Sequence, residues 1–236
     1  MRPRTWSRLA VAAAGGGTVL LVLVAVGWAP LDAADRAGAA WLHRTAHRAP
    51  GWGAANRILT DWVWDPLTMR LLVLAAVVAL LLRGAWRPAG WLAATSLAGL
   101  VAQHGLKLAV GRRRPEWTRP LDAADGWAFP SGHAMTATVS CGLLLVLALW
   151  LRGGSPLWRA GLWTLAVVSV AGAGVTRVVV GVHWPSDVLG GWLFDTAVLA
   201  GCTGWWLRGG RLGGRVGRRR SARAAASGPD GAPGGA

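Results

Sequence analysis

Charged residues are scarce in this chain of 236 residues, at 15% of the total, and only ten of them are acidic. A soluble domain carries about 25% charged residues, so this composition argues against a soluble globular protein. Lysine occurs once, at position 107, among 25 basic residues. Cysteine occurs only as Cys141 and Cys202, both inside apolar runs. Two such cysteines act as small apolar side chains, so no disulfide framework is expected.

Long apolar segments are abundant instead. Six of them run roughly over residues 9–29, 66–82, 88–110, 132–151, 157–178 and 186–207. An α-helix needs about 20 residues to cross a bilayer, and the second segment is at the short end of that range. Arg2, Arg4 and Arg8 precede the first segment as in a cleaved signal, but its apolar part exceeds the ~7–15 residues of a signal core. The sequence therefore predicts an all-α fold, a six-transmembrane helical bundle over residues 1–207.

Arginine is concentrated on one side of this six-span arrangement. The four basic connections are the N-terminus before residue 9, the turns near 83–87 and 152–159, and the segment after residue 207. The positive-inside rule makes that side cytoplasmic, so both termini are expected in the cytoplasm. Residues 208–236, rich in Gly, Arg and Ala, predict a disordered basic cytoplasmic tail that contacts anionic lipid rather than nucleic acid.

Three short constellations lie on the opposite, non-cytoplasmic side. They are Lys107 with Arg114 and Pro115, then Pro130-Ser131-Gly132-His133, and then Arg177 with His183 and Asp187. Each falls at an end of one of spans three to six that faces that side. Counting spans thus predicts that they meet in an active site at the non-cytoplasmic ends of helices 3 to 6.

Lys107 and Arg114 are seven residues apart, or two helical turns, so they share a face if the helix persists that far. Pro115 disfavours helix at the residue before it, which predicts a helix end near Arg114. Charges at membrane depth are functional candidates by default. The alternative for Lys107 is a side chain that snorkels to the headgroups.

The segment Pro130-Ser131-Gly132-His133 is expected to begin a helix. Unpaired backbone N–H groups at such an end, beside a glycine, favour a bound phosphate. His133 in that position is a candidate general acid. An ordinary N-cap by Ser131 is the alternative reading.

His183 and Asp187 open the sixth span around Pro185, which suits the first helical turn. One turn of separation would let the carboxylate accept one imidazole N–H and leave the other nitrogen free as a nucleophile. The alternative is an aspartate that only caps the helix.

Taken together, these residues supply the parts of a phosphoryl-transfer site. His183 is the nucleophile, Asp187 orients it, and His133 protonates the leaving oxygen. The cations Lys107, Arg114 and Arg177, with the N–H groups near Ser131 and Gly132, would neutralise the transition state. No metal or other cofactor is needed in this scheme.

The set resembles the type 2 phosphatidic acid phosphatase (PAP2) family, which is related to vanadium haloperoxidases and glucose-6-phosphatase. The family pattern is K-x6-R-P, P-S-G-H and S-R-x5-H-x3-D. This chain matches it over residues 107–187, with Thr176 in place of serine as the one departure. The hydroxyl is kept.

The resemblance implies a six-helix membrane bundle and metal-independent hydrolysis through a phosphohistidine on His183, with acid–base work by His133. It implies phosphate contacts from Lys107, Arg114, Ser131, Gly132 and Arg177. It also implies a plasma (inner) membrane protein whose outward-facing site acts on phosphatidic acid, phosphatidylglycerol phosphate or undecaprenyl pyrophosphate. The headgroup is not indicated, and we expect specificity to depend on loops 30–64 and 116–129.

Two other function classes remain open at this point. A membrane transporter or flippase for a lipid-linked anion would also place His, Asp and Arg inside a bundle, although repeated halves are not seen. A metal-dependent hydrolase would need three or four ligands, and the nearby cations disfavour it. The pair His43 and His47 has metal-like spacing beside two arginines, and Asp195 and His104 have no assigned role. Oligomeric state is not indicated.

Overall fold

The computed structural model describes residues 3–152 and 154–226, and throughout these residues the regular elements are helices. In chain order they are α1 (Pro3–Ala25), α2 (Ala29–Arg48), α3 (Pro50–Ile58), the π-helical η1 (Leu59–Val63), α4 (Pro66–Leu82), α5 (Trp86–Val110), α6 (Gly132–Arg152), α7 (Pro156–Val179) and α8 (Pro185–Ala226). The all-α prediction is confirmed for this part of the chain.

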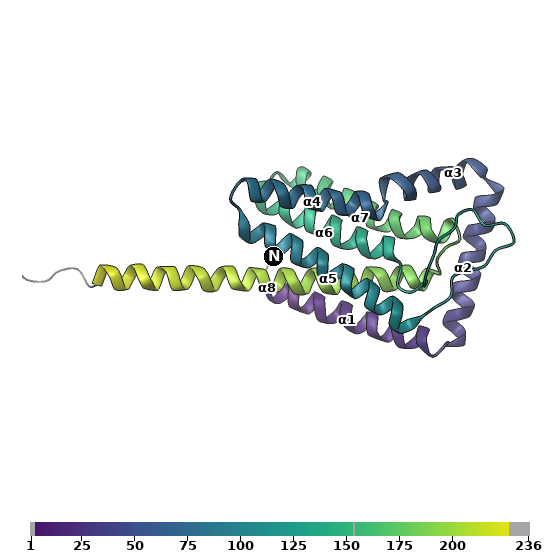
Figure 1. Cartoon of the computed structure of the whole chain (residues 1–236), viewed down its shortest axis with the longest axis horizontal. Coiled ribbons are helices and arrows are strands. Elements are labelled where there is room, and N and C mark those ends of the chain that lie inside the picture. The colour runs from purple at the N-terminus through teal and green to yellow at the C-terminus, as the bar shows by residue number, and fades with distance from the viewer. Residues whose placement is uncertain (1–2, 153, 227–236) are drawn as a thin grey trace, which may run out of the picture.

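Six long helices, α1 and α4 to α8, run side by side, while α2 crosses one end of the bundle (Figure 1). Each coincides with one predicted apolar segment. By length and composition, four stretches of the described residues qualify as membrane spans: Pro3–Ala25, Pro50–Leu82, Gly132–Leu151 and Pro156–Val179. Helices α5 and α8 are not among them, and both carry polar side chains such as Gln103 and Asp195. The count of six spans is therefore not reproduced by this criterion.

The connection expected over residues 30–64 is helical, because it forms α2, α3 and η1. Its first part is rich in alanine, the best helix former. Pro30 and Pro50 each lie in the first turn of a helix, where the missing N–H costs nothing. Helix α2 packs against α7 and α8, so this segment belongs to the scaffold around the end of the bundle.

Helix α5 ends earlier than expected. Gly111 adopts a left-handed conformation with φ of 59°, and its N–H bonds to the Lys107 carbonyl oxygen at 3.0 Å. A glycine in this conformation terminates helices without the steric cost of a Cβ atom. The prediction of a helix end near Arg114 is wrong, because α5 ends at Val110. The condition for a shared helical face is therefore not met, and Arg114 lies in the loop after the helix.

Helix α8 continues to Ala226, whereas we expected the chain to be disordered from Arg208 onward. Arginine and alanine are strong helix formers, and no proline occurs between Pro185 and Pro229. In Figure 1 this extension projects from the end of the bundle opposite α2. Residues 227–236 of the predicted tail lie outside the described residues.

Close packing brings the start of α8 against the start of α6. A Cβ atom at Gly191 would lie 2.9 Å from the Ser131 carbonyl oxygen and 2.9 Å from the Ala134 Cβ. The Ser131 N–H also donates to the Asp187 carbonyl oxygen at 2.9 Å. The contact between these two helix starts therefore has no room for a side chain at Gly191.

Replacing Gly191 by alanine should therefore destabilise the fold by about 1–3 kcal/mol, the usual cost of overpacking, because backbone must move. Gly201→Ala is the matched control in the same helix, since a Cβ atom there meets nothing within 4 Å. Unfolding of purified protein in detergent measures both changes. Equal stability of the two variants would contradict the packing argument.

Candidate active site

A cavity of about 290 Å³ lies where α5 and α7 end and α6 begins. Six of the eight predicted site residues line it: Lys107, Arg114, Gly132, His133, Arg177 and His183. They come from the last turn of α5, the loop 111–131, the first turn of α6, the last turn of α7 and the loop before α8. The structure thus brings all three constellations to one cavity.

His183 is held from both sides of its ring. Its Nδ1 lies 3.3 Å from Asp187 Oδ2, and its Nε2 lies 3.0 Å from Arg114 Nη1. The same Asp187 oxygen accepts the Trp184 N–H at 2.8 Å. This arrangement orients the imidazole through Nδ1 and presents Nε2 beside a guanidinium that faces the cavity.

Asp187 does not line the cavity, because its side chain is 0% exposed behind His183. Its second oxygen accepts a hydrogen bond from Arg112 Nη1 at 2.8 Å, and Arg112 Nη2 reaches Asp35 Oδ2 at 2.8 Å. Asp35 also accepts the Ser186 N–H at 2.9 Å and the Ser186 hydroxyl. Two buried carboxylates therefore share one arginine.

The sequence analysis assigned no role to Arg112 or Asp35. Burial on its own would lower the pKa of Arg112, but Asp187 and Asp35 raise it. The signal in the sequence is that the loop 111–131 contains four arginines, although it lies on the predicted non-cytoplasmic side, where the positive-inside rule does not expect them. One of these arginines, Arg112, pairs with buried carboxylates instead of lying on the surface.

Arg114 is fixed by backbone carbonyl groups. Its Nε donates to the Gly126 carbonyl oxygen at 2.9 Å, Nη1 to that of Val182 at 2.8 Å and Nη2 to that of Asp125 at 2.9 Å. Burial, followed by the charge of Arg177, lowers the pKa of Arg114. Carbonyl groups of the loop 111–131 thereby fix the side chain of Arg114, which belongs to the same loop, next to His183.

Arg177 is 5% exposed and pairs with Asp122 Oδ2 at 3.0 Å. It also donates to the Thr60 hydroxyl at 3.3 Å, so η1 and the loop 111–131 both reach it. Sequence analysis assigned no role to either partner. Lys107 differs, because it forms no ion pair within residues 3–151 and 154–209.

At the start of α6, Ser131 does not lie where a residue predicted to contact phosphate is expected. Ser131 is buried and does not line the cavity, and its N–H is committed to the Asp187 carbonyl oxygen. Gly132 does line the cavity, and a Cβ atom there would lie 2.8 Å from the Gln103 amide nitrogen. The helix start therefore offers the cavity Gly132 and His133, while Ser131 joins α6 to α8.

The remaining histidines do not form a metal site in the described part of the chain. The Nε2 atoms of His43 and His47 lie 3.1 Å apart, and both face the Arg119 carbonyl oxygen. The ring of His104 hydrogen-bonds the Leu100 carbonyl oxygen within α5, at the rim of the cavity. No group of three metal-ligating side chains occurs among these residues.

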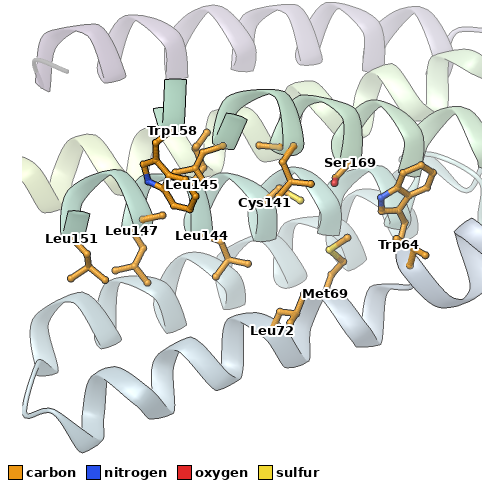
Figure 2. A pocket seen from close by; sticks show the side chains of 15 residues that line it. Trp64, Met69, Leu72, Cys141, Leu144, Leu145, Leu147, Leu151, Trp158 and Ser169 are labelled. Atoms are coloured by element: carbon orange, nitrogen blue, oxygen red, sulfur yellow. The ribbon is translucent and has the colours of Figure 1, made fainter. Parts of the chain in front are cut away.

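A separate apolar groove of about 610 Å³ lies between α4, α6 and α7 (Figure 2). Leucines of α4 and α6 line its length, Trp64 stands at one end and Trp158 lies near the other. Met69 of the groove is next in the chain to Arg70 of the polar cavity, and Trp64 of the groove lies close in the chain to Pro66 of the cavity. An apolar surface thus begins beside the charged one.

Comparison with known proteins identifies the family of this chain. Residues 88–211, more than half of the chain, match the PAP2 superfamily. The chain therefore belongs to the PAP2 superfamily. Its fold is similar to that of a transmembrane PAP2-type phosphatidylglycerolphosphate phosphatase from Bacillus subtilis, with a TM-score of 0.73 and 21% identity over 83% of this chain and 94% of that one. Together with its apolar helices, this likeness identifies a membrane protein.

Two curated relatives match shorter regions. An undecaprenyl-diphosphatase of Sulfolobus acidocaldarius is 36% identical over 70 residues, 30% of this chain and 29% of that protein. A phosphatidylglycerophosphatase B of Escherichia coli strain K12 is 38% identical over 104 residues, 43% of this chain and 37% of that protein. The chain thus matches well under half the length of either. These comparisons give the transporter alternative no support.

The shared arginine should make Asp35 important for stability. Asp35→Asn removes one charge from a buried pair, at a cost of about 3 kcal/mol. Asp32→Asn is the matched control, because Asp32 is 32% exposed and 3.4 Å from the same guanidinium, and an exposed pair contributes at most about 1 kcal/mol. Denaturant unfolding in detergent compares the variants. Similar small losses of stability in both variants would contradict the conclusion that Arg112 and Asp35 form a buried ion pair.

The cationic surroundings of His183 should be visible in its titration. Burial, and then the charges of Arg114, Arg177 and Lys107, lower the pKa of His183 well below its ordinary value. A lowered pKa keeps the imidazole neutral at about pH 6, where a free histidine is mostly protonated. Arg114→Gln removes one of these charges, so the pKa should rise. Ring NMR titration measures it, with Arg119→Gln as the control that leaves it unchanged. A wild-type His183 that protonates near pH 6.5 would refute this prediction.

Proposed function

We propose that this chain is a membrane lipid phosphatase that hydrolyses a phosphomonoester or diphosphate of a lipid through a phosphohistidine on His183. The observation that carries the proposal is the common cavity, which is lined by both His183 and His133 and by the predicted phosphate-binding cations Lys107, Arg114 and Arg177. Membership of the PAP2 superfamily and the phosphatase names of the matched relatives support it. Phosphatidic acid, phosphatidylglycerol phosphate and undecaprenyl pyrophosphate are the substrate types to test.

In the first half of the reaction, Lys107, Arg114 and Arg177 hold the phosphoryl oxygens. His183 Nε2 attacks phosphorus, and the bond from phosphorus to the leaving oxygen breaks while His133 gives that oxygen a proton. The carboxylate of Asp187 stabilises the positive charge that develops on the His183 ring. The preorganised cations neutralise the five-coordinate transition state.

In the second half, a water molecule attacks the phosphohistidine. His133, now deprotonated, accepts a proton from that water, and the bond from phosphorus to His183 breaks. Phosphate leaves and His183 returns to its neutral form with Nε2 free. The three cations supply the charge that a metal ion provides in other phosphatases, so we propose that the reaction requires no metal or other cofactor.

We further propose a plasma-membrane arrangement of six spans, formed by α1 and α4 to α8, as one domain over residues 1–207. The arginine-rich connections are cytoplasmic under the positive-inside rule, as are both termini and the basic segment from residue 208. The cavity then faces outward, as the position of α2 at the end away from the α8 extension supports (Figure 1). The neighbouring apolar groove would receive the chain of the lipid.

Purified protein should release phosphate from a lipid phosphate in the presence of a metal chelator, and vanadate should inhibit it. His183→Ala should lower the rate by about a thousandfold or more, as expected for loss of a nucleophile. His47→Ala, a histidine outside the cavity, is the matched control and should retain activity. With labelled substrate, an alkaline quench should leave label on wild-type protein and none on His183→Ala.

Two results would contradict the proposal. One is a fully active His183→Ala variant, which would remove the nucleophile from the scheme. The other is an absolute requirement for an added divalent metal, which would favour a metal-dependent hydrolase. A panel of lipid phosphates assayed with the same preparation separates the candidate substrates.

A further inference from the structure

A second polar layer lies one helical turn below the cavity residues. Arg70, one turn into α4, donates through Nη2 to the Thr136 hydroxyl at 3.2 Å and to Oε1, the side-chain amide oxygen of Gln103, at 3.5 Å. Thr136 follows His133 by three residues on α6, and Gln103 precedes Lys107 by four residues on α5. Such spacings place each pair on one helix face. Arg70 is therefore anchored just beneath both the candidate acid and a candidate phosphate-binding cation.

Arg70 itself lines the 290 Å³ cavity, as does Gln103. Among residues 3–151 and 154–209, Arg70 forms no ion pair, and its other N–H groups make no hydrogen bond. A small cavity of about 10 Å³ behind it is lined by Arg70, Gln103 and Asp195. Asp195 is 1% exposed, and one of its oxygens has no partner. Asp195 thus lies behind Arg70, and the Arg70 N–H groups that make no hydrogen bond are available to the cavity.

The position of Arg70 matters for the direction in which a substrate lies. Lys107, Arg114 and Arg177 already suffice for the transferred phosphoryl group. Arg70 is a fourth cation on the membrane-inward side of His133, which protonates the leaving oxygen. Met69, which is next to Arg70 in the chain, lines the apolar groove, so a leaving group whose lipid chain enters that groove would pass Arg70. A cation is useful at that place if the leaving group itself carries negative charge.

We propose that Arg70, together with Gln103, binds the lipid-side phosphate of a lipid diphosphate and makes the chain prefer diphosphates over monophosphates of the same lipid. This inference rests on the proposed function. His183 takes the terminal phosphoryl group, the bond from its phosphorus to the bridging oxygen breaks, and His133 protonates that oxygen. The lipid monophosphate leaves with its charge partly neutralised by Arg70, and water then releases inorganic phosphate from His183.

The experiment compares farnesyl diphosphate and farnesyl monophosphate, which share one chain, as substrates of the purified full-length protein in detergent. Arg70→Gln should lower kcat/KM for the diphosphate by about tenfold or more, the effect of losing a charge-assisted hydrogen bond, and change the monophosphate value much less. Arg70→Lys, which keeps the charge, should retain more of the preference. Arg83→Gln, an exposed arginine at the other end of α4, is the matched control and should change neither value.

An equal loss on both substrates would assign Arg70 a purely structural role between α4, α5 and α6 and overturn the inference. No loss on either substrate, or a wild-type preference for the monophosphate, would also overturn it. If the Arg70 variants do not fold, the proposal can still be tested by inhibition of the wild-type protein. A farnesyl methylene-diphosphonate should inhibit it more strongly than a farnesyl phosphonate. Equal inhibition by the two compounds would contradict the proposal. Failure of the proposed function looks different, since wild-type protein would then hydrolyse neither substrate.

Discussion

The buried carboxylate of Asp187 is the group on which the geometry of the site depends. One oxygen accepts from Arg112, and the other faces the His183 ring and the Trp184 N–H. A carboxylate removed from water costs several kcal/mol unless it is paired and hydrogen-bonded. Arg112 is also paired with Asp35 of α2. Helix α2, the loop 111–131 and the start of α8 must therefore dock together before His183 acquires its orientation.

The helices of the bundle were predictable because their signal is local. Each predicted apolar segment coincides with one long helix, and the length of an apolar run suffices to find it. The convergence of Lys107, His133 and His183 on one cavity was predictable for a related reason. Successive spans alternate in direction, so the sequence position of a helix end determines the side on which it lies.

The remaining features depend on contacts between distant segments. The partners of Arg112 are 77 residues away at Asp35 and 75 residues away at Asp187, and no local pattern links them. Helices α2 and α3 contain no long apolar run, so a search for spans treats them as a connection. The end of α5 was misplaced because Pro115 was weighted above Gly111, whose left-handed conformation stops the helix first.

The ion-paired carboxylates behind His183 and the cations on its cavity side give the site its direction. The carboxylates of Asp35 and Asp187 are buried behind the ring, whereas Lys107 and Arg114 lie on the cavity side. Arg114 is held by neutral carbonyl groups rather than by an acid, so its position is fixed while its charge is not cancelled. Cations held near one another in this way repel, and a bound phosphoryl group relieves that repulsion. In the proposed reaction, the same preorganised charge would therefore stabilise a five-coordinate phosphorus.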